Sequence, residues 1–418
     1  MTQEIITFGC RLNSYESEVI KDNLRKANLN DVIVFNTCAV TKEAERQAKQ
    51  AIRKARRENP DKKIIVTGCS AQINPDQYAK MSEVDKVIGN EEKLSEKSYR
   101  EPFSIENSEK VLVNDIMSIK ETASHMVSSL DGKARAFVQV QNGCNHRCTF
   151  CIIPYGRGNS RSVPIGEIVT QVRKLVESGY KEVVVTGVDI TDYGKDLPGT
   201  PTLGQMMKRL LALVPELPRL RLSSVDVAEI DEDLFALIEH EPRLMPHFHI
   251  SLQAGDNMIL KRMKRRHTRE DVLRFVEKVR AMRPYVSFGA DIIAGFPTET
   301  DEMFENTLNL VHEAGLQHLH VFPYSERSGT PAAKMPQLPK QVRKERAARL
   351  RAAGEVELAK YLSTQKGRTI SAIVEQDNFA RAEDFSLVEI ASGQKIGELV
   401  SVEVASSVGN KLMGGALV

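Results

Sequence analysis

Cysteine is scarce in this sequence, with six residues in 418, and the six are not spaced like a secreted disulfide framework. This scarcity excludes a small disulfide-stabilised scaffold and predicts a reducing, cytoplasmic compartment. Long apolar runs are missing too. None approaches the ~20 residues that cross a bilayer, so we expect no membrane partner. The first six residues lack the basic segment and apolar core of a signal peptide.

A large excess of charge of one sign is also missing. Lysine and arginine number 58 and aspartate and glutamate 56, so the overall charge does not indicate a general nucleic-acid binder. We expect no DNA partner. The length predicts about two to four domains. Evidence of function must therefore come from local motifs.

Three of the cysteines stand close together, at Cys144, Cys148 and Cys151. Random placement of six cysteines would give this spacing roughly 0.001 times in such a chain, so chance explains it poorly. Iron–sulfur clusters are held by cysteine thiolates, normally four, and three would leave one iron open to a small molecule. Zinc would require a fourth ligand, and His146 inside the loop could supply it. The spacing alone leaves iron and zinc both open.

The surroundings of this loop favour iron. An alternating apolar run over residues 135–141 predicts a strand before the loop, and the aromatic Phe150 precedes the third cysteine. This pattern resembles the signature of the radical S-adenosylmethionine (radical SAM) superfamily, Cys-x3-Cys-x-aromatic-Cys after the first strand of a partial barrel. The resemblance implies a [4Fe-4S] cluster whose open iron binds the amino and carboxylate groups of S-adenosylmethionine, with Phe150 near the adenine.

Cys10, Cys38 and Cys69 each follow a short β-branched run, and helical patterns lie between the runs. The predicted strands span residues 5–9, 32–37 and 63–68, and the predicted helices span 14–27 and 41–58. This order predicts a parallel sheet, in which the carboxyl ends of the strands share one edge. Ordinary buried cysteines are the alternative. Their common position at three strand ends favours a second cluster site.

The residues around these cysteines resemble a family. Residues 7–13, 36–41 and 67–72 look like the three amino-terminal cysteine motifs of the methylthiotransferases, which are radical SAM enzymes with an auxiliary cluster. The resemblance covers nearly the whole chain. It implies two [4Fe-4S] clusters, one held by Cys144, Cys148 and Cys151 and the auxiliary one held by Cys10, Cys38 and Cys69.

The middle of the chain alternates between strand and helix patterns. The predicted strands span 135–141, 182–188, 219–225, 247–254, 286–293 and 318–322, with notable helices at 165–177, 269–282 and 300–314. Six such units predict an open, partial (β/α)6 barrel. In barrels of this kind the chemistry lies at the carboxyl ends of the strands.

Residues at those strand ends are candidates for binding S-adenosylmethionine. Gly187 and Asp189 lie in a segment that resembles the Gly-Gly-Glu segment of the superfamily, whose backbone holds the methionine amino group. The change to Gly-Val-Asp leaves the role of the Asp189 side chain open. Residues 291–297 resemble the segment that supports the adenine. The candidate cofactor-binding residues are Phe150, Gly187, Asp189, Ser223, Gln253, Asp291 and Gly295.

Two basic segments belong to the predicted rim, at residues 261–269 and just after the cluster loop. A charge run is usually a solvated face. At a site that accepts a polyanion, phosphate contact becomes comparably favoured. The candidate RNA-binding residues are Arg157, Arg161, Lys264, Arg265 and Arg266. The basic helix expected at 340–351 is interpreted as a solvated face.

The last sixty residues change to short alternating runs with glycines, at 367–374, 385–390 and 398–404. These runs predict a small antiparallel β-barrel. It resembles the TRAM domain, an RNA-binding module that ends many methylthiotransferases. Residues 361–418 contain five lysines and arginines but seven aspartates and glutamates. Because an electrostatic RNA clamp should be basic, we expect local or shape-based binding, or a scaffolding role.

The predicted fold class is therefore α/β in three parts. Residues 1–120 form an open parallel α/β sheet domain with the auxiliary cluster, residues 132–358 form the radical SAM barrel, and residues 361–418 form the TRAM-like barrel. By resemblance, a 5′-deoxyadenosyl radical takes hydrogen from adenine C2 of a tRNA base. Sulfur is then transferred and methylated by a second S-adenosylmethionine. The reaction implies an external electron donor and a sulfur source. It does not require an acid–base catalytic residue, and we name none.

Within the family, Cys-Arg-x-Asn at Cys10 and residues 187–191 look like the branch that acts on N6-threonylcarbamoyladenosine beside the anticodon. The alternatives are the isopentenyladenosine branch, which usually shows Cys-Gln-Met-Asn, and the branch that modifies an aspartate of a ribosomal protein. A rival of another class is a non-catalytic RNA-binding iron–sulfur redox sensor. That rival leaves the cofactor-like segments at 186–189 and 291–297 unexplained.

Overall fold

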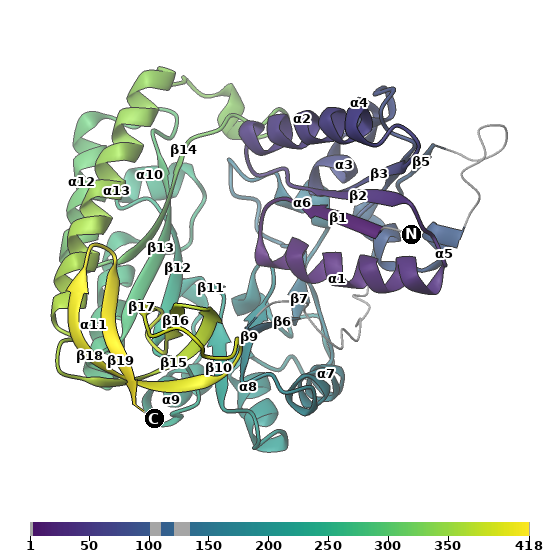
Figure 1. Cartoon of the computed structure of the whole chain (residues 1–418). Helices are drawn as coiled ribbons and strands as arrows, with labels where there is room; N and C mark the ends of the chain where they lie inside the picture. Colours follow the sequence, from purple (N-terminus) through teal and green to yellow (C-terminus); the bar gives the residue numbers. More distant parts are fainter. Residues whose placement is uncertain (1–2, 101–109, 121–133, 418) are drawn as a thin grey trace.

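The computed structural model describes residues 3–100, 110–120 and 134–417. A parallel sheet flanked by helices is followed along the chain by a partial barrel and a small closed β-barrel (Figure 1). The predicted α/β class is confirmed. The predicted division between residues 120 and 132 falls almost wholly on residues outside the described part of the chain.

The amino-terminal sheet has five parallel strands in sequence order. They are β1 (Gln3–Thr7), β2 (Val32–Thr37), β3 (Lys63–Gly68), β4 (Lys86–Ile88) and β5 (Val111–Leu112). The first three strands were predicted and are confirmed. The last two contain only three and two residues, which is too short for a recognisable pattern.

Helices cover both faces of this sheet. Ile20 and Leu24 of α1 (Arg11–Lys26) pack against Val32 and Val34 on one face, where α5 (Lys97–Arg100) also lies. On the other face, Ile52 of α2 (Lys42–Glu58) packs with neighbours from α4 (Pro75–Ala79). The short α3 (Cys69–Ile73) begins directly at the end of β3. The cysteine-bearing ends of β1, β2 and β3 therefore lie along one edge.

The central part is an open barrel of parallel strands in two sheets. One sheet has the order β10-β9-β6 and the other β11-β12-β13-β14. The strands are β6 (Ala136–Gln139), β9 (Glu182–Thr186), β10 (Arg219–Leu222), β11 (Ser224–Val225), β12 (His247–Gln253), β13 (Ser287–Ala294) and β14 (His318–Pro323). One residue, Ser223, separates β10 from β11, so the two sheets form six strand positions. All six predicted strands are confirmed.

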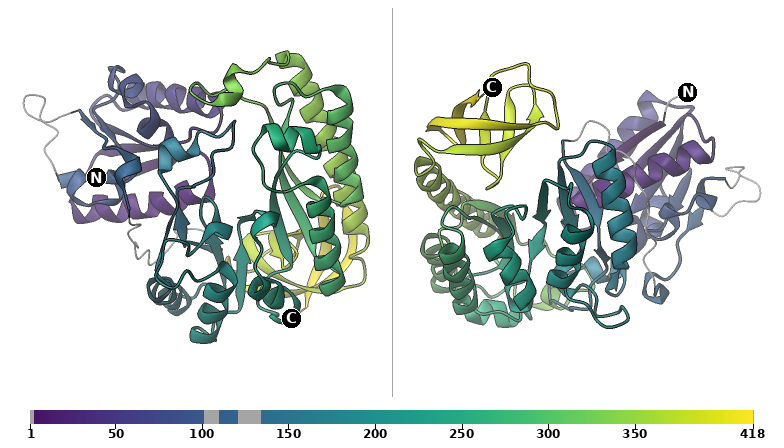
Figure 2. Two further views of the ribbon diagram at one scale, coloured as in Figure 1. Left: turned by 180° about the vertical axis from the view of Figure 1, so that it is seen from behind. Right: turned by 90° about the horizontal axis from the view of Figure 1, so that it is seen from below.

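Helices line the outside of this barrel (Figures 1 and 2). They are α7 (Ile165–Glu177), α8 (Leu203–Leu213), α9 (Glu232–His240), α10 (Asn257–Arg262), α11 (Arg269–Met282), α12 (Asp301–Glu313) and α13 (Lys340–Ser363). Thr202 and Thr268 close the first turns of α8 and α11 with capping boxes. The predicted helix at 340–351 is longer than expected, and its extension leads into the carboxyl-terminal barrel.

The amino-terminal part shares a core with the central barrel. Tyr15 and Val19 of α1 belong to the same buried cluster as Val138 of β6 and Val183 of β9. Helix α1 thus packs beside β6, at one edge of the open barrel.

The carboxyl-terminal part is a closed barrel in the order β15-β16-β17-β19-β18. Its strands are β15 (Thr369–Gln376), β16 (Phe379–Ala382), β17 (Leu387–Glu389), β18 (Leu399–Val408) and β19 (Lys411–Leu417). The predicted strands at 367–374, 385–390 and 398–404 are confirmed, and β16 and β19 are additions. The barrel was predicted to be antiparallel throughout, but β17 pairs with β19 in parallel. This closed barrel is consistent with the TRAM-like module.

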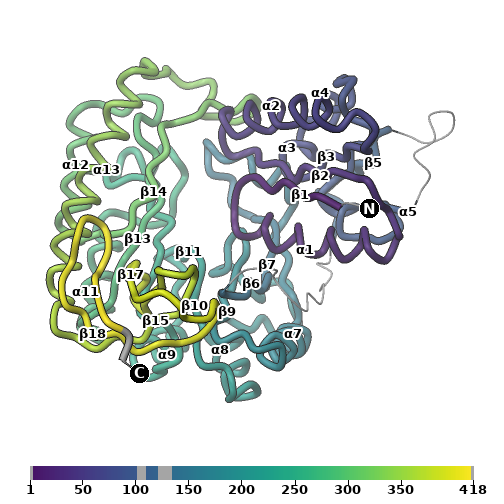
Figure 3. Tube along the Cα trace, in the orientation of Figure 1, coloured from purple at the N-terminus to yellow at the C-terminus, as the bar shows by residue number. Residues whose placement is uncertain are grey.

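The closed barrel contacts the amino ends of the central strands. Arg219 at the start of β10 donates to Ser371 Oγ at 2.6 Å, and Arg221 on the same strand donates to Glu383 O at 3.1 Å. The Cα trace in Figure 3 shows this yellow segment beside β9, β10 and β11. Among the described residues, the structure contains no helix of the length and apolar character that crossing a membrane requires.

Candidate active site

The Cys144–Cys151 loop lies in the connection between two short antiparallel strands, β7 (Gln141–Asn142) and β8 (Arg161–Ser162). The Cys144 amide donates to Gly158 O at 3.1 Å, which closes the base of the loop. Thr149 fixes its far side, because its amide donates to Met263 O at 3.1 Å and its hydroxyl donates to Arg262 O at 2.8 Å. The loop is thus held to the carboxyl side of β12.

The three thiols of this loop are free and partly exposed. Burial, followed by the Asp189 carboxylate, raises the pKa of Cys144. Burial also raises the pKa of Cys151, to about 12, and the neighbouring Cys148 adds to the rise. Thiolates that repel one another in a dehydrated site are the donor set that a soft metal centre stabilises. The chemistry of this donor set therefore fits an iron–sulfur cluster.

His146 does not point to a zinc site. Its Nε2 lies 3.1 Å from Asp189 Oδ2 and 3.7 Å from Glu229 Oε2. Hydrogen bonding with Asp189 and Glu229 raises the pKa of His146 to about 9. His146 is therefore paired with carboxylates of the barrel rim rather than directed at the three thiols.

The amino-terminal cysteines converge as predicted. A Cβ on Gly9 would lie 2.8 Å from Cys38 Sγ, and Gly9 has φ +97°, so the chain at Cys10 approaches Cys38 as only glycine permits. Burial raises the pKa of Cys38 to about 12, with further contributions from Cys69 and then Cys10. Asn90 Nδ2 lies 3.6 Å from Cys69 Sγ. These three thiols form a second donor set of the same kind.

Helix α6 (Ile153–Arg157) connects the two sets of cysteines. It follows the Cys144–Cys151 loop directly and packs on α3, which begins at Cys69. A Cβ on Gly156 would lie 3.3 Å from Cys69 Cβ. Asn90 donates to Gly156 O. Both sets of cysteines therefore lie next to one short helix.

Arg157 ends α6 in a buried polar network. Its guanidinium donates to Glu16 at 2.7 and 2.9 Å and to Asn13 at 2.6 Å. Burial opposes its charge, but the nearby Cys69 and Glu16 hold the pKa of Arg157 above its ordinary value. Lys93 Nζ also lies 2.6 Å from Glu16. This network places positive charge behind the amino-terminal thiols, where it stabilises an anionic centre.

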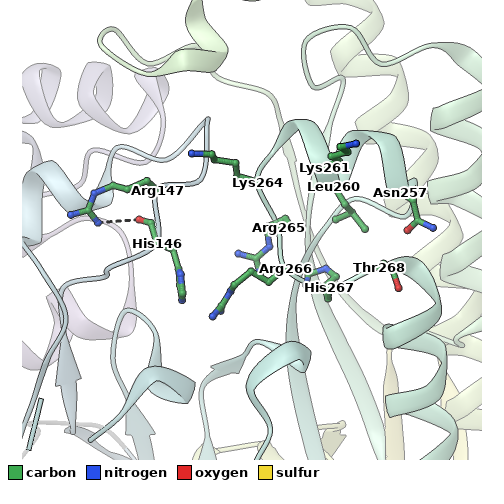
Figure 4. A pocket seen from close by; sticks show the side chains of 10 residues that line it. All are labelled: His146, Arg147, Asn257, Leu260, Lys261, Lys264, Arg265, Arg266, His267 and Thr268. Atoms are coloured by element: carbon green, nitrogen blue, oxygen red, sulfur yellow. Dashed lines mark hydrogen bonds between the residues drawn. The ribbon is translucent and has the colours of Figure 1, made fainter. Parts of the chain in front are cut away.

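A basic pocket opens beside the Cys144–Cys151 loop (Figure 4). Its lining residues are His146, Arg147, Asn257, Leu260, Lys261, Lys264, Arg265, Arg266, His267 and Thr268. Two of its arginines are held by Asp226, because Arg265 and Arg266 each lie 2.9 Å from Asp226 Oδ2. Burial opposes ionisation of Asp226, but His267 and Arg265 lower its pKa. Figure 4 shows Lys264 extending toward Arg147 across the opening.

The structure brings several predicted cofactor-binding residues to the barrel rim. Gln141 Oε1 accepts hydrogen bonds from the Val188 and Asp189 amides, at 3.0 and 2.9 Å, so it fixes the segment after Gly187. Asp189 lies 3.7 Å from Cys144 Sγ. Gln253 ends β12 with φ +72°, an unusual conformation for a residue with a side chain.

Phe150, Ser223 and Gly295 support the rim from within the protein. Phe150 packs edge-on against Phe296, with ring centroids 6.4 Å apart. The Ser223 amide donates to Val185 O at 2.9 Å. Gly295 has φ +71°, and a Cβ there would lie 2.7 Å from Arg343 Cγ. These three residues shape the rim by packing and backbone conformation.

Asp291 lies deeper in the barrel with two histidines that the sequence analysis missed. Asp291 Oδ1 is 3.1 Å from His249 Nε2 and 3.2 Å from His320 Nδ1. Burial opposes ionisation of Asp291, but His249 and His320 lower its pKa. Ligand atoms of these residues are close enough to hold a metal ion, and so are those of His146, Asp192 and Glu229. The His-x-His spacing at 247–249 and 318–320 was the available signal.

The predicted RNA-binding residues separate into two groups. Arg157 and Arg161 are each only 2 % exposed, and both are hydrogen-bonded within the protein. A buried guanidinium cannot reach a phosphate, which corrects this part of the prediction. Arg265 is held in the protein by Asp226 and by Ser251 O at 2.8 Å. Lys264 and part of Arg266 remain exposed at the pocket.

Two family models match the sequence. Residues 138–311 match the radical SAM superfamily, and residues 2–89 match the uncharacterized protein family UPF0004. The first match contains the Cys144–Cys151 loop and most of the barrel. The second contains Cys10, Cys38 and Cys69.

Two similar curated proteins cover most of the chain. The threonylcarbamoyladenosine tRNA methylthiotransferase MtaB of Rickettsia prowazekii is 62% identical over 97% of this chain and 95% of its own length. The tRNA-2-methylthio-N(6)-dimethylallyladenosine synthase of Halalkalibacterium halodurans is 33% identical over 89% of this chain and 71% of its own length. The sequence identity to the first protein is thus nearly twice the identity to the second.

The fold resembles solved structures at low sequence identity. The radical S-adenosylmethionine methyltransferase TsrM of Kitasatospora setae superimposes with a TM-score of 0.56 and 14% identity, over 88% of this chain and 78% of that one. This likeness concerns the fold alone. It agrees with a partial barrel that carries the cysteine loop after its first strand.

Proposed function

The chain belongs to the MtaB-type family of radical SAM methylthiotransferases, and we propose that it converts N6-threonylcarbamoyladenosine beside the tRNA anticodon to its 2-methylthio derivative. The observation that carries this proposal is that both sets of free cysteines lie next to the short helix α6, one directly before it in the chain and the other packed against it. A redox sensor needs no such pair of cysteine sets beside candidate cofactor-binding residues. The 62% identity to an enzyme of that name supports the substrate.

We infer that the six cysteines are the cluster ligands, with Cys144, Cys148 and Cys151 in one set and Cys10, Cys38 and Cys69 in the other. When bound, two [4Fe-4S] clusters and S-adenosylmethionine supply the radical chemistry and the sulfur transfer. The residues of this chain hold these groups, orient the base and exclude water. The buried Arg157 and Lys93 balance negative charge at the amino-terminal set.

Our candidates for the S-adenosylmethionine site are the rim residues Phe150, Gly187, Asp189, Ser223, Gln253 and Gly295, together with the deeper Asp291. Asp189 is the rim carboxylate beside Cys144, and His146 Nε2 lies 3.1 Å from its Oδ2. A carboxylate there would accept hydrogen bonds from the ammonium of an amino acid. Gly295 and the segment after Gly187 would contribute backbone groups.

We infer that the tRNA backbone contacts the pocket of Figure 4 through Lys264 and Arg266. The net-acidic carboxyl-terminal barrel contacts the central strands through Arg219 and helix α13 through Tyr361, which supports a scaffolding role. The three-part division at 1–120, 132–358 and 361–418 remains our proposal. An external electron donor and a sulfur source are required by the reaction, and a tRNA substrate implies a cytoplasmic enzyme.

The test is mass spectrometry of nucleosides from tRNA of a strain that lacks this gene, compared with its parent. We expect selective loss of 2-methylthio-N6-threonylcarbamoyladenosine and accumulation of the precursor, both reversed by the intact gene. Loss of the isopentenyl derivative instead would retain the reaction and overturn the substrate. An unchanged tRNA profile would overturn the proposal, and ribosomal proteins would be measured next.

A further inference from the structure

Arg11 extends from the first turn of α1 into the lower part of the central barrel. Its guanidinium carbon lies 5.9 Å from the centroid of the Phe385 ring, which belongs to the carboxyl-terminal barrel. The charged groups that act on it come from the central strands and their ends: Arg135, Glu182, Arg221 and Asp291. Three parts of the fold therefore meet around this side chain.

No carboxylate among the described residues pairs with Arg11, which is half-buried. Each of the other guanidiniums near the Phe385 ring has a carboxylate partner. Arg135 lies 2.5 Å from Glu375, Arg221 lies 2.7 Å from Glu182, and Arg381 lies 3.0 Å from Glu375. Arg11 thus differs from its arginine neighbours in having no carboxylate partner in the part of the chain that the structure describes.

The nearest acidic candidate in the barrel is already engaged. Asp291 acts on Arg11 through space, but its Oδ1 is 3.1 Å from His249 and 3.2 Å from His320. A half-buried guanidinium without a counter-charge is unfavourable, and an anionic ligand would reduce that cost. The unpaired Arg11 guanidinium is therefore suited to binding an anion.

The chemistry of the proposed substrate supplies such an anion. The threonylcarbamoyl group ends in a carboxylate, whereas unmodified adenosine and the isopentenyl derivative carry no charge at this position. We propose that Arg11 binds the threonyl carboxylate and so selects the substrate, an inference that rests on the proposed function. Arginine suits this role because its planar fork pairs with a carboxylate through two parallel hydrogen bonds.

The position of Arg11 agrees with the size of the substrate. Five covalent bonds join adenine C6 to the carboxylate carbon, a reach of roughly 6 Å. Arg11 follows Cys10 directly in the chain. A base whose carboxylate lies on Arg11 would therefore be anchored at the residue that follows one of the proposed cluster ligands.

The test compares three synthetic anticodon stem-loops with the reconstituted holoenzyme. One carries N6-threonylcarbamoyladenosine, the second carries its methyl ester, and the third carries unmodified adenosine. We expect the wild type to bind the acid at least roughly tenfold more tightly than the ester. Arg11→Gln should bind acid and ester equally, and Arg11→Lys should restore part of the preference because it keeps the charge.

Arg381→Gln is the matched control, since Arg381 lies over the same ring but has a carboxylate partner. It should retain the preference for the acid. A wild type that binds acid and ester alike would overturn the inference. So would an Arg11→Gln variant that loses affinity equally for all three stem-loops, which would indicate a phosphate contact, or one that loses affinity for S-adenosylmethionine.

Failure of the inference is distinguishable from failure of the proposed function. Formation of the methylthio product from the acid stem-loop by the wild-type holoenzyme tests the function alone. If that product forms but acid and ester bind equally, only the role of Arg11 is wrong. Iron content and circular dichroism of each variant establish that it has folded and carries its clusters.

Discussion

Arg157 Nη1 and Glu16 Oε1 lie 2.7 Å apart in a fully buried ion pair that joins α6 to α1. The two residues are 141 positions apart in the sequence. Lys93 Nζ lies 2.6 Å from the other oxygen of the same carboxylate. One carboxylate of the amino-terminal part thus pairs with two buried cations, and the net positive charge that remains lies beside the cysteines.

Replacing Glu16 by Gln should destabilise the protein strongly. The variant would leave two buried cations without their carboxylate, and breaking a buried pair in this way costs about 3–5 kcal/mol. We expect a clear fall in the midpoint of thermal denaturation and reduced iron at the amino-terminal site. Anaerobic calorimetry and iron analysis of the reconstituted protein measure both.

The matched control is Glu43→Gln on α2. Glu43 also pairs with an arginine, Arg46, but both side chains are more than half exposed. The midpoint should stay unchanged in this variant. Equal effects of the two substitutions would refute a special role for the buried pair.

The two sets of cysteines should lose their iron independently. Cys148→Ala removes one ligand of the loop set, and Cys38→Ala removes one ligand of the amino-terminal set. Each variant should retain about half of the wild-type iron, because each set is built on its own loop or sheet edge. Reductive cleavage of S-adenosylmethionine to 5′-deoxyadenosine should disappear in Cys148→Ala and persist in Cys38→Ala.

Anaerobic reconstitution, iron analysis and chromatographic detection of 5′-deoxyadenosine measure these outcomes. Loss of all iron from either single variant would show that the two sites do not assemble separately. Gly156 of α6 packs against Cys69. If losing one cluster lowers the iron content of the other site slightly, we expect the effect to pass through this helix.

Local patterns were sufficient to predict the strands that carry cysteines. Cys10, Cys38 and Cys69 each follow a β-branched run, and parallel strands bring their carboxyl ends to one edge. The partners of Arg157 could not be predicted in this way. Its basic neighbourhood in the sequence indicated an RNA contact, whereas tertiary packing brings it to Glu16 and buries it.

The barrel interior shows the same limit. His249, Asp291 and His320 come from three different strands, and only the strand register brings them together. The contact of Phe385 with Arg11 requires the docking of the carboxyl-terminal barrel, which no spacing in the sequence encodes. The fold class and cysteine groups were therefore predictable, and the charge network between the parts was not.

Binding of tRNA should depend on the exposed lysines of the pocket. Lys261 and Lys264 are exposed there, and no carboxylate among the described residues pairs with either. In the double variant Lys261→Ala, Lys264→Ala, the slope of log affinity against log salt should become shallower by about 1.4–1.8. Fluorescence anisotropy at several salt concentrations measures this slope. Lys208→Ala, on the outer helix α8, should leave it unchanged.

The stability of the protein should fall as the pH decreases below about 6.5, because of His318 on β14. Burial, then the charge of Arg381, lowers the pKa of His318 to about 3. The charged or titratable groups that face it also include Arg221, His249 and His320. Between pH ~6.5 and ~3 the unfolded chain binds a proton at this residue and the folded chain does not. The resulting stabilisation is therefore complete above the unfolded pKa and is lost toward acid, by about 1.4 kcal/mol per pH unit.

His318→Gln should remove the difference in proton binding between the folded and unfolded chain at this position. Its midpoint of thermal denaturation should fall less between pH 7.5 and 5.5 than that of the wild type, although packing against the Phe385 ring is also altered. His240→Gln is the control, because the His240 side chain is 74% exposed on α9 and meets water in both states. Its pH dependence should match the wild type. If His318→Gln shows the full wild-type dependence as well, the titrating groups lie elsewhere, and His247, whose pKa burial also lowers, is the next residue to replace.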